Sequence, residues 1–326
     1  MAASDAVWDG GVKWGVVATI KADAATILRF VAYHLELGAH RIYIYLDAPC
    51  PEAQEALKAH PKTRVVRCDD GYWKRKKGNR PDMHQPRQTF NATHAYGRAH
   101  EVEWLIHIDA DEFLVPEGRV AAQLAALPET VQCARTRPME LLSGGDPEID
   151  AAFKTFVSAG KLREQVVAAL YPTFGQHLRG GFLSHVAGKI FVRTGANDIK
   201  FRIHNVFQDG EMNPNHVEIP NIHLAHFHAT DWDSWHSHFA YRHREGSYRA
   251  ELGPERARER GGITMHELFD FIHAEQGAAG LRAFFDEVCA DTPALRARLE
   301  DHGCLHRTTF PFTTALAKNF PDFAKI

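Results

Sequence analysis

The 326-residue sequence has few of the features that mark secreted or membrane-spanning proteins. Its five cysteines are odd in number and widely spaced, without a C-x-x-C pair. This excludes a disulfide framework or zinc finger and favours ordinary thiols in a reducing compartment. No run approaches the roughly 18 apolar residues that span a bilayer, and residues 1–11 lack the basic and apolar regions of a signal peptide. We therefore expect a cytoplasmic protein with no transmembrane segment, and leave peripheral attachment to a membrane open.

Neither sign of charge dominates the sequence. The net charge is only -3, so the overall field gives no reason to expect nucleic acid or an anionic membrane as the main partner. The basic run Lys74–Lys77, with Arg80, stands in the polar stretch 69–86, which contains two prolines and is expected to be a surface loop. It lacks the interleaved aromatic residues of a nucleic-acid surface. We expect no nucleic-acid partner.

The first third of the chain alternates strand and helix patterns. Apolar runs rich in β-branched residues predict strands at 14–20, 41–46 and 63–68, and helical patterns lie between them at 23–37 and 51–60. This βαβαβ order predicts a parallel sheet with right-handed crossovers.

The rest of the chain continues this pattern and then becomes mostly helical. Helices are expected at 85–100 and 118–127, and strands at 103–108, 131–137, 188–194 and 219–227. From residue 231 on, helical patterns dominate, with Thr292 and Pro293 as N-cap and first residue of a late helix. We thus expect an α/β fold with a Rossmann-like, mostly parallel sheet flanked by helices. Its catalytic domain would span residues 1–230, with a helical extension, 231–326, packed on it.

Acidic residues follow each of the first four expected strands. Asp23, Asp47 and Asp70 follow the first three, and Asp109 and Asp111 follow the fourth. Ligands of open α/β sheets bind at the carboxyl ends of the strands, where the loops diverge. We therefore expect these carboxylates to lie along one edge of the sheet.

The pair Asp109 and Asp111 predicts a metal site. In an extended segment, residues two apart project from the same side with Cα atoms about 6.6 Å apart, and Mg²⁺ or Mn²⁺ prefers such oxygen ligands. Apolar runs, WLIHI and FLVP, flank the pair and hold it near the interior, where a cation offsets the cost of burying carboxylates. An ion there could neutralise a diphosphate leaving group. The alternative is that each aspartate caps a turn or pairs with an arginine.

Four segments, in this order, resemble one enzyme family. They are TIKADAATILRFVAYHLELGAHRIYIYLD, RQTFNATHAYGRAHEVEWLIHIDADEFLVP, GKIFVR and HFHATDWDSWHSHFAYRHREG. Between residues 13 and 247 they are similar to the family-2-like glycosyltransferases of the glycosyltransferase-A (GT-A) fold that carry an IDxDEF motif. The resemblance implies a metal-dependent hexosyltransferase-like enzyme of polysaccharide biosynthesis, with a UDP- or GDP-sugar donor and a glycan or other hydroxyl acceptor.

The same resemblance implies roles for residues around the aspartate pair. The donor-facing residues are Asp47 and Asp70 at the uracil and ribose pocket, and Arg87, Gln88 and Asn91 on the helix before the Asp109 strand. The sequence departs from the family pattern at Ala22-Asp23 and Asp47-Ala48, where relatives have Asn-Glu and Asp-Asn. These departures concern the nucleoside contacts more than the metal site.

Two further residues are candidates for the diphosphate region. His226 matches a family histidine near the diphosphate or metal, and imidazole suits Mn²⁺; the alternative is a core histidine. Lys189 could hold a phosphate oxygen. The spacing from His226 to Asp231 also suggests a metal-dependent hydrolase that uses His223, His226 and His228. That spacing is one residue too long for the hydrolase motif, and Asp231 fits a capping box.

An inverting transferase also needs a carboxylate base opposite the metal pair. The candidates are Glu140, Asp209, Glu211 and Asp231. Glu140 is preferred because it follows the strand expected at 131–137, on the acceptor side. A non-enzymatic alternative is a catalytically inert module that binds a nucleotide.

Overall fold

The computed structural model describes residues 11–323, and their contacts divide the chain into two compact units. Unit 1 comprises the chain up to Arg137, Gly188–Leu224 and the chain from Pro311 on; unit 2 comprises Pro138–Ala187 and Ala225–Phe310. This division differs from the expected boundary after residue 230. The chain leaves unit 1 at residue 138, returns at 188, leaves again at 225 and ends in unit 1.

Unit 1 is a mixed α/β sheet flanked by helices. Its elements are β1 (Trp14–Ile20), α1 (Ala24–Glu36), β2 (Arg41–Leu46), α2 (Pro51–Ala59), β3 (Thr63–Arg67), α3 (Asp70–Lys77), α4 (His84–Tyr96), β4 (Trp104–His107), β5 (Glu112–Pro116), α5 (Val120–Ala125), the start of β6 (Cys133–Leu141), β8 (Lys189–Arg193), β9 (Lys200–Phe201), β10 (Val206–Gln208), β11 (Glu211–Met212), most of β12 (His216–His226) and α11 (Phe312–Asn319). Strands β9 to β11 form a separate three-stranded sheet.

The strand order of unit 1 confirms the expected βαβαβ arrangement. Strand β1 pairs in parallel with β2, with Gly15 opposite Arg41, and β2 pairs in parallel with β3. The other edge of β1 pairs in parallel with β4, after which β8 and β6 continue the sheet antiparallel. The carboxyl ends of β1 to β4 therefore meet at one edge of the sheet, where the acidic residues that follow these strands begin the loops.

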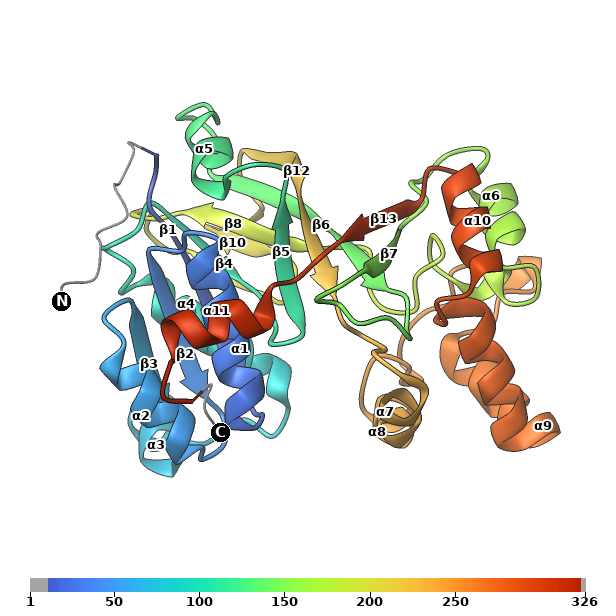
Figure 1. Ribbon diagram of the computed structural model, residues 1–326, viewed down its shortest axis with the longest axis horizontal. Helices are drawn as coiled ribbons and strands as arrows, with labels where there is room; N and C mark the ends of the chain where they lie inside the picture. Colours follow the sequence, from blue (N-terminus) through green and yellow to red (C-terminus); the bar gives the residue numbers. More distant parts are fainter. Residues whose placement is uncertain (1–10, 324–326) are drawn as a thin grey trace. The chain divides into compact units, whose positions relative to one another are not determined.

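Local sequence signals account for the helices of unit 1. Asp23 caps α1 by accepting a hydrogen bond from the backbone of Thr26 (2.7 Å), and Pro51 begins α2. Helices α1 and α11, from opposite ends of the chain, lie side by side (Figure 1). Their interface includes the ring of Phe312, which lies 5.5 Å from that of Tyr33 between centroids.

The loop expected at residues 69–86 is wrong in its first half. Residues Asp70–Lys77 form α3, capped by Asp69, which accepts a hydrogen bond from the backbone of Tyr72 (2.8 Å). Tyr72 and Trp73 are buried in the unit 1 core. These two aromatic side chains pack α3 against the core, while its basic residues lie on the exposed side. The basic run is therefore part of a short amphipathic helix.

Unit 2 is mainly helical, and its strands pair with one another. Its elements are the end of β6, β7 (Ala151–Thr155), α6 (Arg163–Leu170), the 3₁₀ helix η1 (Gly175–His177), α7 (Trp232–Ser237), α8 (Phe239–Arg244), the 3₁₀ helix η2 (Arg258–Arg260), α9 (Met265–Val288), α10 (Pro293–Asp301) and β13 (Leu305–Thr308). Strand β7 pairs antiparallel with both β6 and β13. The core is aromatic, with Trp235, Phe269, Phe284 and Phe285 in contact.

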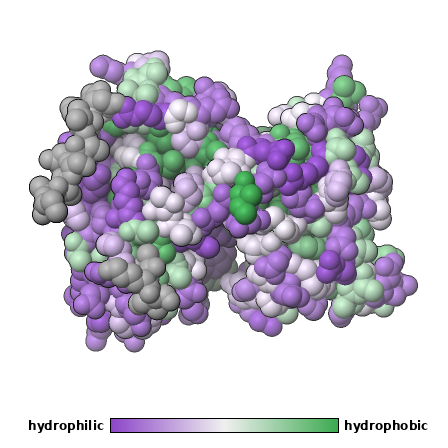
Figure 2. Space-filling model, viewed as in Figure 1, coloured by the Kyte–Doolittle hydropathy of each residue, from purple (hydrophilic) through white to green (hydrophobic). Residues whose placement is uncertain are grey.

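The surface that Figure 2 shows is mainly hydrophilic, and the cysteines lie inside the units. Hydrophilic residues cover most of the visible surface, with small hydrophobic areas between them (Figure 2). The five cysteines are free thiols and all are buried. Within residues 11–323, no helix combines the length and the apolar character needed to cross a bilayer.

Candidate active site

The Asp109-Ala110-Asp111 segment forms a turn at the end of β4. The backbone N–H of Glu112 donates to the Asp109 carbonyl (3.1 Å), and the Asp109 N–H donates to the Glu112 carboxylate (2.8 Å). The extended conformation expected for this segment is therefore wrong. The turn exposes Asp111, leaves Asp109 partly exposed and buries Glu112.

A buried lysine lies against this turn. Lys189, on β8, places Nζ 2.7 Å from an Asp109 oxygen and 3.2 Å from a Glu112 oxygen. Burial alone would lower the pKa of Lys189, but the two carboxylates outweigh it and raise the pKa above its usual value. Burial likewise raises the pKa of Asp109, and the Lys189 ammonium reverses this and holds it below the ordinary range. Lys189 therefore contacts two carboxylates in this structure. The phosphate contact that we expected for it stays a prediction.

Two polar side chains complete the cluster. Gln88, on α4, donates a hydrogen bond from Nε2 to Asp109, and its expected role of facing the donor stays a prediction. His107 is buried two residues before Asp109, and neither ring nitrogen has a hydrogen-bond partner among the described residues. Burial, reinforced by Lys189, lowers the pKa of His107 to about 4, so the ring is neutral at pH 7. Glu112 and His107 were not among the predicted site residues, although both belong to the HIDADEF run.

The donor atoms at this turn fit a hard divalent cation. Asp109 and Glu112 both place a carboxylate oxygen within ion-pair distance of the Lys189 ammonium group. Asp111 adds a third carboxylate on the exposed side of the same turn. Carboxylate oxygens are the ligands that Mg²⁺ and Mn²⁺ prefer, and partial exposure leaves positions for substrate oxygens. Asp111 would be the main protein ligand, with Asp109 shared between the ion and Lys189.

Asp47 lies buried at the end of β2 between two arginines. Arg87 donates from Nε to one carboxylate oxygen (2.8 Å), and Arg80 donates to the other (3.0 Å). The structure thus pairs Arg87 with Asp47, and the donor contacts that the resemblance implied for the two residues stay predictions. Arg80, expected to lie in a solvated loop, instead covers the Asp47 backbone and side chain.

The other predicted nucleoside residues have structural partners or lie exposed. Asn91 is buried, accepting from the Tyr72 hydroxyl (2.7 Å) and donating to Thr19 (3.1 Å). Asp23 caps α1, and Asp70 is exposed in the first turn of α3. Asn91 therefore ties α4 to β1 and α3 instead of presenting a free amide.

Two of the three histidines of the hydrolase hypothesis lie together, with the rings of His226 and His228 5.1 Å apart between centroids. His223 and His226 are an odd number of residues apart on β12, so their side chains leave opposite faces of the strand. In unit 2, His226 Nδ1 lies 3.1 Å from the Ser184 hydroxyl, and His228 Nε2 lies 2.9 Å from the Tyr248 hydroxyl. Burial lowers the pKa of His228 well below its usual value. The role of His226 as a metal ligand stays a prediction.

Glu140, the preferred base, is held in a buried ion pair within unit 2. Its carboxylate accepts backbone hydrogen bonds from Leu183 (3.0 Å) and Ser184 (2.6 Å) and lies 3.2 Å from Lys154 Nζ. Burial raises the pKa of Glu140, but Lys154 and the two backbone donors outweigh it and hold the pKa below its ordinary value. A carboxylate with three donors and a lowered pKa is a poor proton acceptor, so the contacts of Glu140 are those of a structural group.

Asp231, the second predicted base, is the N-cap of α7. Its side chain accepts a hydrogen bond from the Ser234 N–H (2.7 Å). We expect Asp231→Ala to lower the free energy of unfolding by about 1 kcal/mol, because α7 loses its cap, and to leave nucleotide binding and turnover unchanged. Denaturant unfolding and a transfer assay measure the two effects. Asp231→Ser, which can still cap the helix, is the control; a collapse of turnover in Asp231→Ala alone would return the residue to the base candidates.

The position of Lys189 depends on Gly188, which has a φ of 69°. A Cβ atom at residue 188 would lie 2.0 Å from the carbonyl oxygen of Thr136 on the neighbouring strand β6. We therefore expect Gly188→Ala to lower the free energy of unfolding by about 2–3 kcal/mol, through both strain and the clash. Denaturant unfolding measures the loss. Gly195 is the matched control, since it also has a positive φ, 90°, but a Cβ there meets nothing within 4 Å. Equal losses for the two alanine variants would contradict the clash.

The model of glycosyltransferase family 92 matches residues 17–252. No curated protein matches the chain.

Three solved structures that match the chain are distant from it in sequence. GalNAc-T7 with UDP, GalNAc and Mn²⁺ has 10% identity and a TM-score of 0.38, over 96% of this chain and 57% of that one. The galactosyltransferase LgtC with donor and acceptor sugar analogues has 12% identity and a TM-score of 0.26, over 55% of this chain and 57% of that one. A mycobacterial protein has 14% identity and a TM-score of 0.31, over 56% and 54%. The chain thus spans little more than half the length of each, and at these scores the likeness carries no weight for function.

Proposed function

The chain belongs to glycosyltransferase family 92, and we propose that it moves a sugar from a nucleotide-diphosphate donor to a hydroxyl group of a glycan or similar acceptor. This family differs from the family-2-like group that the motifs resembled. The observation that carries the proposal is the charge cluster at the end of β4, where Asp109 and Glu112 share Lys189 and Asp111 lies exposed on the same turn. Burying the Lys189 ammonium group and the Glu112 carboxylate is costly, so the need to hold a strand end in place does not by itself account for this arrangement.

The proposed residue roles follow from the contacts of the cluster. A divalent ion, Mn²⁺ or Mg²⁺, held by Asp111 and Asp109 would supply charge neutralisation for the departing diphosphate. Lys189 keeps Asp109 ionised, and Gln88 orients its carboxylate. The turn closed by Glu112 keeps Asp111 directed away from the core.

The proposed reaction forms a bond between the acceptor oxygen and the anomeric carbon while the bond from that carbon to the diphosphate oxygen breaks. The acceptor proton passes to a base and the nucleoside diphosphate leaves. In an inverting reaction the base is a side chain on the opposite face of the sugar. Glu140 and Asp231 are engaged in structural contacts, and we assign neither to this step.

The proposal is tested by titrating UDP, and then GDP, into the purified chain by calorimetry, with and without Mn²⁺. We expect one of the two nucleotides to bind in a metal-dependent manner, and the matching nucleotide sugar to be transferred or slowly hydrolysed. Failure of both nucleotides to bind would contradict the proposal. Binding without any transfer or donor hydrolysis would favour the catalytically inert module instead.

A further inference from the structure

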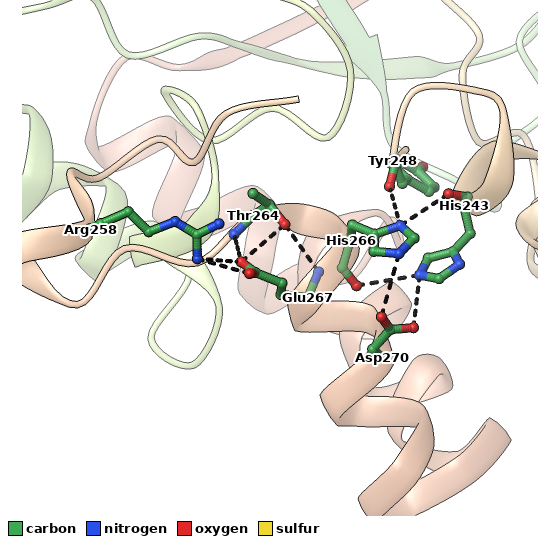
Figure 3. Close-up of polar contacts among 7 residues, drawn as sticks. All are labelled: His243, Tyr248, Arg258, Thr264, His266, Glu267 and Asp270. Carbon is green, nitrogen blue, oxygen red and sulfur yellow. Dashed lines mark hydrogen bonds and ion pairs between the residues drawn. The ribbon is translucent and has the colours of Figure 1, made fainter. Parts of the chain in front are cut away.

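A second cluster of metal-binding residue types lies in unit 2, apart from the residues of the proposed transfer site. His243 stands on α8, and His266 and Asp270 stand one turn apart on α9. Their ligand atoms all lie within 4.8 Å of one another. Figure 3 shows the Asp270 carboxylate directed at both imidazole rings. The family match ends at residue 252, so it covers only His243 of the three.

The carboxylate of Asp270 has only imidazole partners among the described residues. One oxygen lies 3.1 Å from His243 Nε2, and the other lies 3.5 Å from His266 Nε2. Asp270 is 60% exposed, yet no described lysine or arginine lies within ion-pair distance of it. Tetrahedral Zn²⁺, with bonds of 2.0–2.1 Å to nitrogen and oxygen, separates neighbouring ligand atoms by about 3.3 Å. The two observed separations bracket this value.

The hydrogen bonds of His266 direct its other nitrogen toward the same point. His266 Nδ1 lies 3.1 Å from the carbonyl oxygens of both His243 and Tyr248. A carbonyl can only accept, so Nδ1 carries a proton, and Nε2, which faces Asp270, is the nitrogen left to bind an ion. A metal-binding histidine is characteristically held by such a bond from its second nitrogen.

The start of α9 is rigid where it presents His266 and Asp270. Thr264 and Glu267 form a capping box, and Arg258 donates to both Glu267 oxygens at 2.8 Å (Figure 3). On the other side, the His243 ring stacks on that of Phe239, also on α8. Two ligands therefore come from a fixed helix turn, and the third comes from the helix that precedes the long connection to it.

We propose that His243, His266 and Asp270 bind a divalent transition-metal ion of the Zn²⁺ class. Two nitrogens and one oxygen favour such an ion over Mg²⁺ or Ca²⁺, which prefer oxygen ligands throughout. The cluster opens into a cavity of about 570 Å³, lined also by His273 and Glu251, which leaves the fourth coordination position for water or a small ligand. The bound ion would join α8 to the first turn of α9 and so hold the ends of the connecting segment together.

Metal binding requires a local change at His243. Its ring stacks on that of His266 at 3.8 Å between centroids, with planes 11° apart. Lone pairs lie in the ring planes, so two nearly parallel rings cannot both point at one ion, and the His243 ring has to rotate. In the structure, His243 Nε2 lies 3.3 Å from the His266 carbonyl oxygen and 3.1 Å from an Asp270 oxygen, both of which accept a hydrogen bond. For Nε2 to bind the ion, the proton of the His243 ring has to be on Nδ1 instead.

The test uses the full chain, stripped with a chelator and free of nucleotide, titrated with Zn²⁺ by calorimetry and with Co²⁺ by visible spectroscopy. We expect one saturable ion, intense Co²⁺ bands of tetrahedral type, no displacement by excess Mg²⁺ and a raised Tm with Zn²⁺. Asp270→Asn and His266→Gln should each weaken Zn²⁺ binding more than about tenfold and remove the rise in Tm.

The control variant is His273→Gln, which changes an exposed histidine of the same cavity and should bind Zn²⁺ as the parent does. Asp270 is exposed, so Asp270→Asn tests the site even if His266→Gln does not fold. Zn²⁺ binding that persists in Asp111→Ala separates this site from the proposed transfer site. Absence of Zn²⁺ binding in the parent, or equal affinity in Asp270→Asn, would overturn the proposal.

Discussion

Asp111→Ala is expected to reduce sugar transfer by on the order of 10²–10³-fold and to remove the effect of Mn²⁺ on nucleotide binding. Asp111 is the exposed carboxylate of the β4 turn, whereas Asp109 already shares its charge with Lys189. Loss of Asp111 therefore removes the main protein ligand of the proposed ion, while the buried cluster behind it stays intact. Calorimetry of UDP and GDP with and without Mn²⁺, together with initial rates, measures both effects.

The exposure of Asp111 makes this variant a clean test. We expect its free energy of unfolding to change by no more than about 0.5 kcal/mol, as for other surface positions. Glu129→Ala removes an exposed carboxylate of the same unit and should change neither binding nor rate. Metal-dependent binding of equal strength in Asp111→Ala would show that the ion is not held at this turn.

Glu140→Gln is expected to lower the free energy of unfolding by about 3–5 kcal/mol, because it leaves the buried Lys154 without its carboxylate. Lys154 is 1% exposed, and it also contacts the Val288 carbonyl and the ring of Tyr171. Neither carries a full negative charge. Denaturant unfolding measures the loss. Adding Lys154→Met should restore part of it, since the double variant removes both charges.

A surface pair provides the matched control. Arg137 and Glu218 are both about two-fifths exposed, so Glu218→Gln should cost no more than about 1 kcal/mol. If Glu140→Gln were as stable as the parent but unable to transfer sugar, Glu140 would be the base after all.

The pH dependence of stability follows from the same pair. The folded pKa of Glu140 lies below its usual value of 4.5, so its contribution is complete above that pH and is lost as the pH falls through the folded pKa. The pKa of Lys154 is raised above its usual 10.5, because Tyr171 and Glu140 outweigh the effect of burial, and its contribution is complete below 10.5. Stability from the pair should thus be greatest between these values, and the acid loss should be absent in the double variant.

The strand and helix pattern of the first third could be predicted because its signals are local. Strands β1 and β2 are apolar runs with the bounds that the sequence indicated, and Pro51 marks the start of α2. Helix α3 was missed because only burial of Tyr72 and Trp73 distinguishes its basic sequence from a loop. The placement of Asp109 after a buried strand was also readable, since it depends on a run of apolar residues directly before it.

What the sequence by itself determined is the α/β class, the parallel start of the sheet and the edge at which its acidic residues gather, because periodicity and capping act over a few residues. Only the tertiary structure decided which charges meet. Lys189 lies 80 residues from Asp109, and Arg87 lies 40 residues from Asp47. Such pairs depend on how the strands and helices pack, so the spacing of residues along the chain does not predict which charged residues form an ion pair. The same holds for Glu140, where an opposing lysine from the neighbouring strand β7 turns a predicted base into half of a buried ion pair.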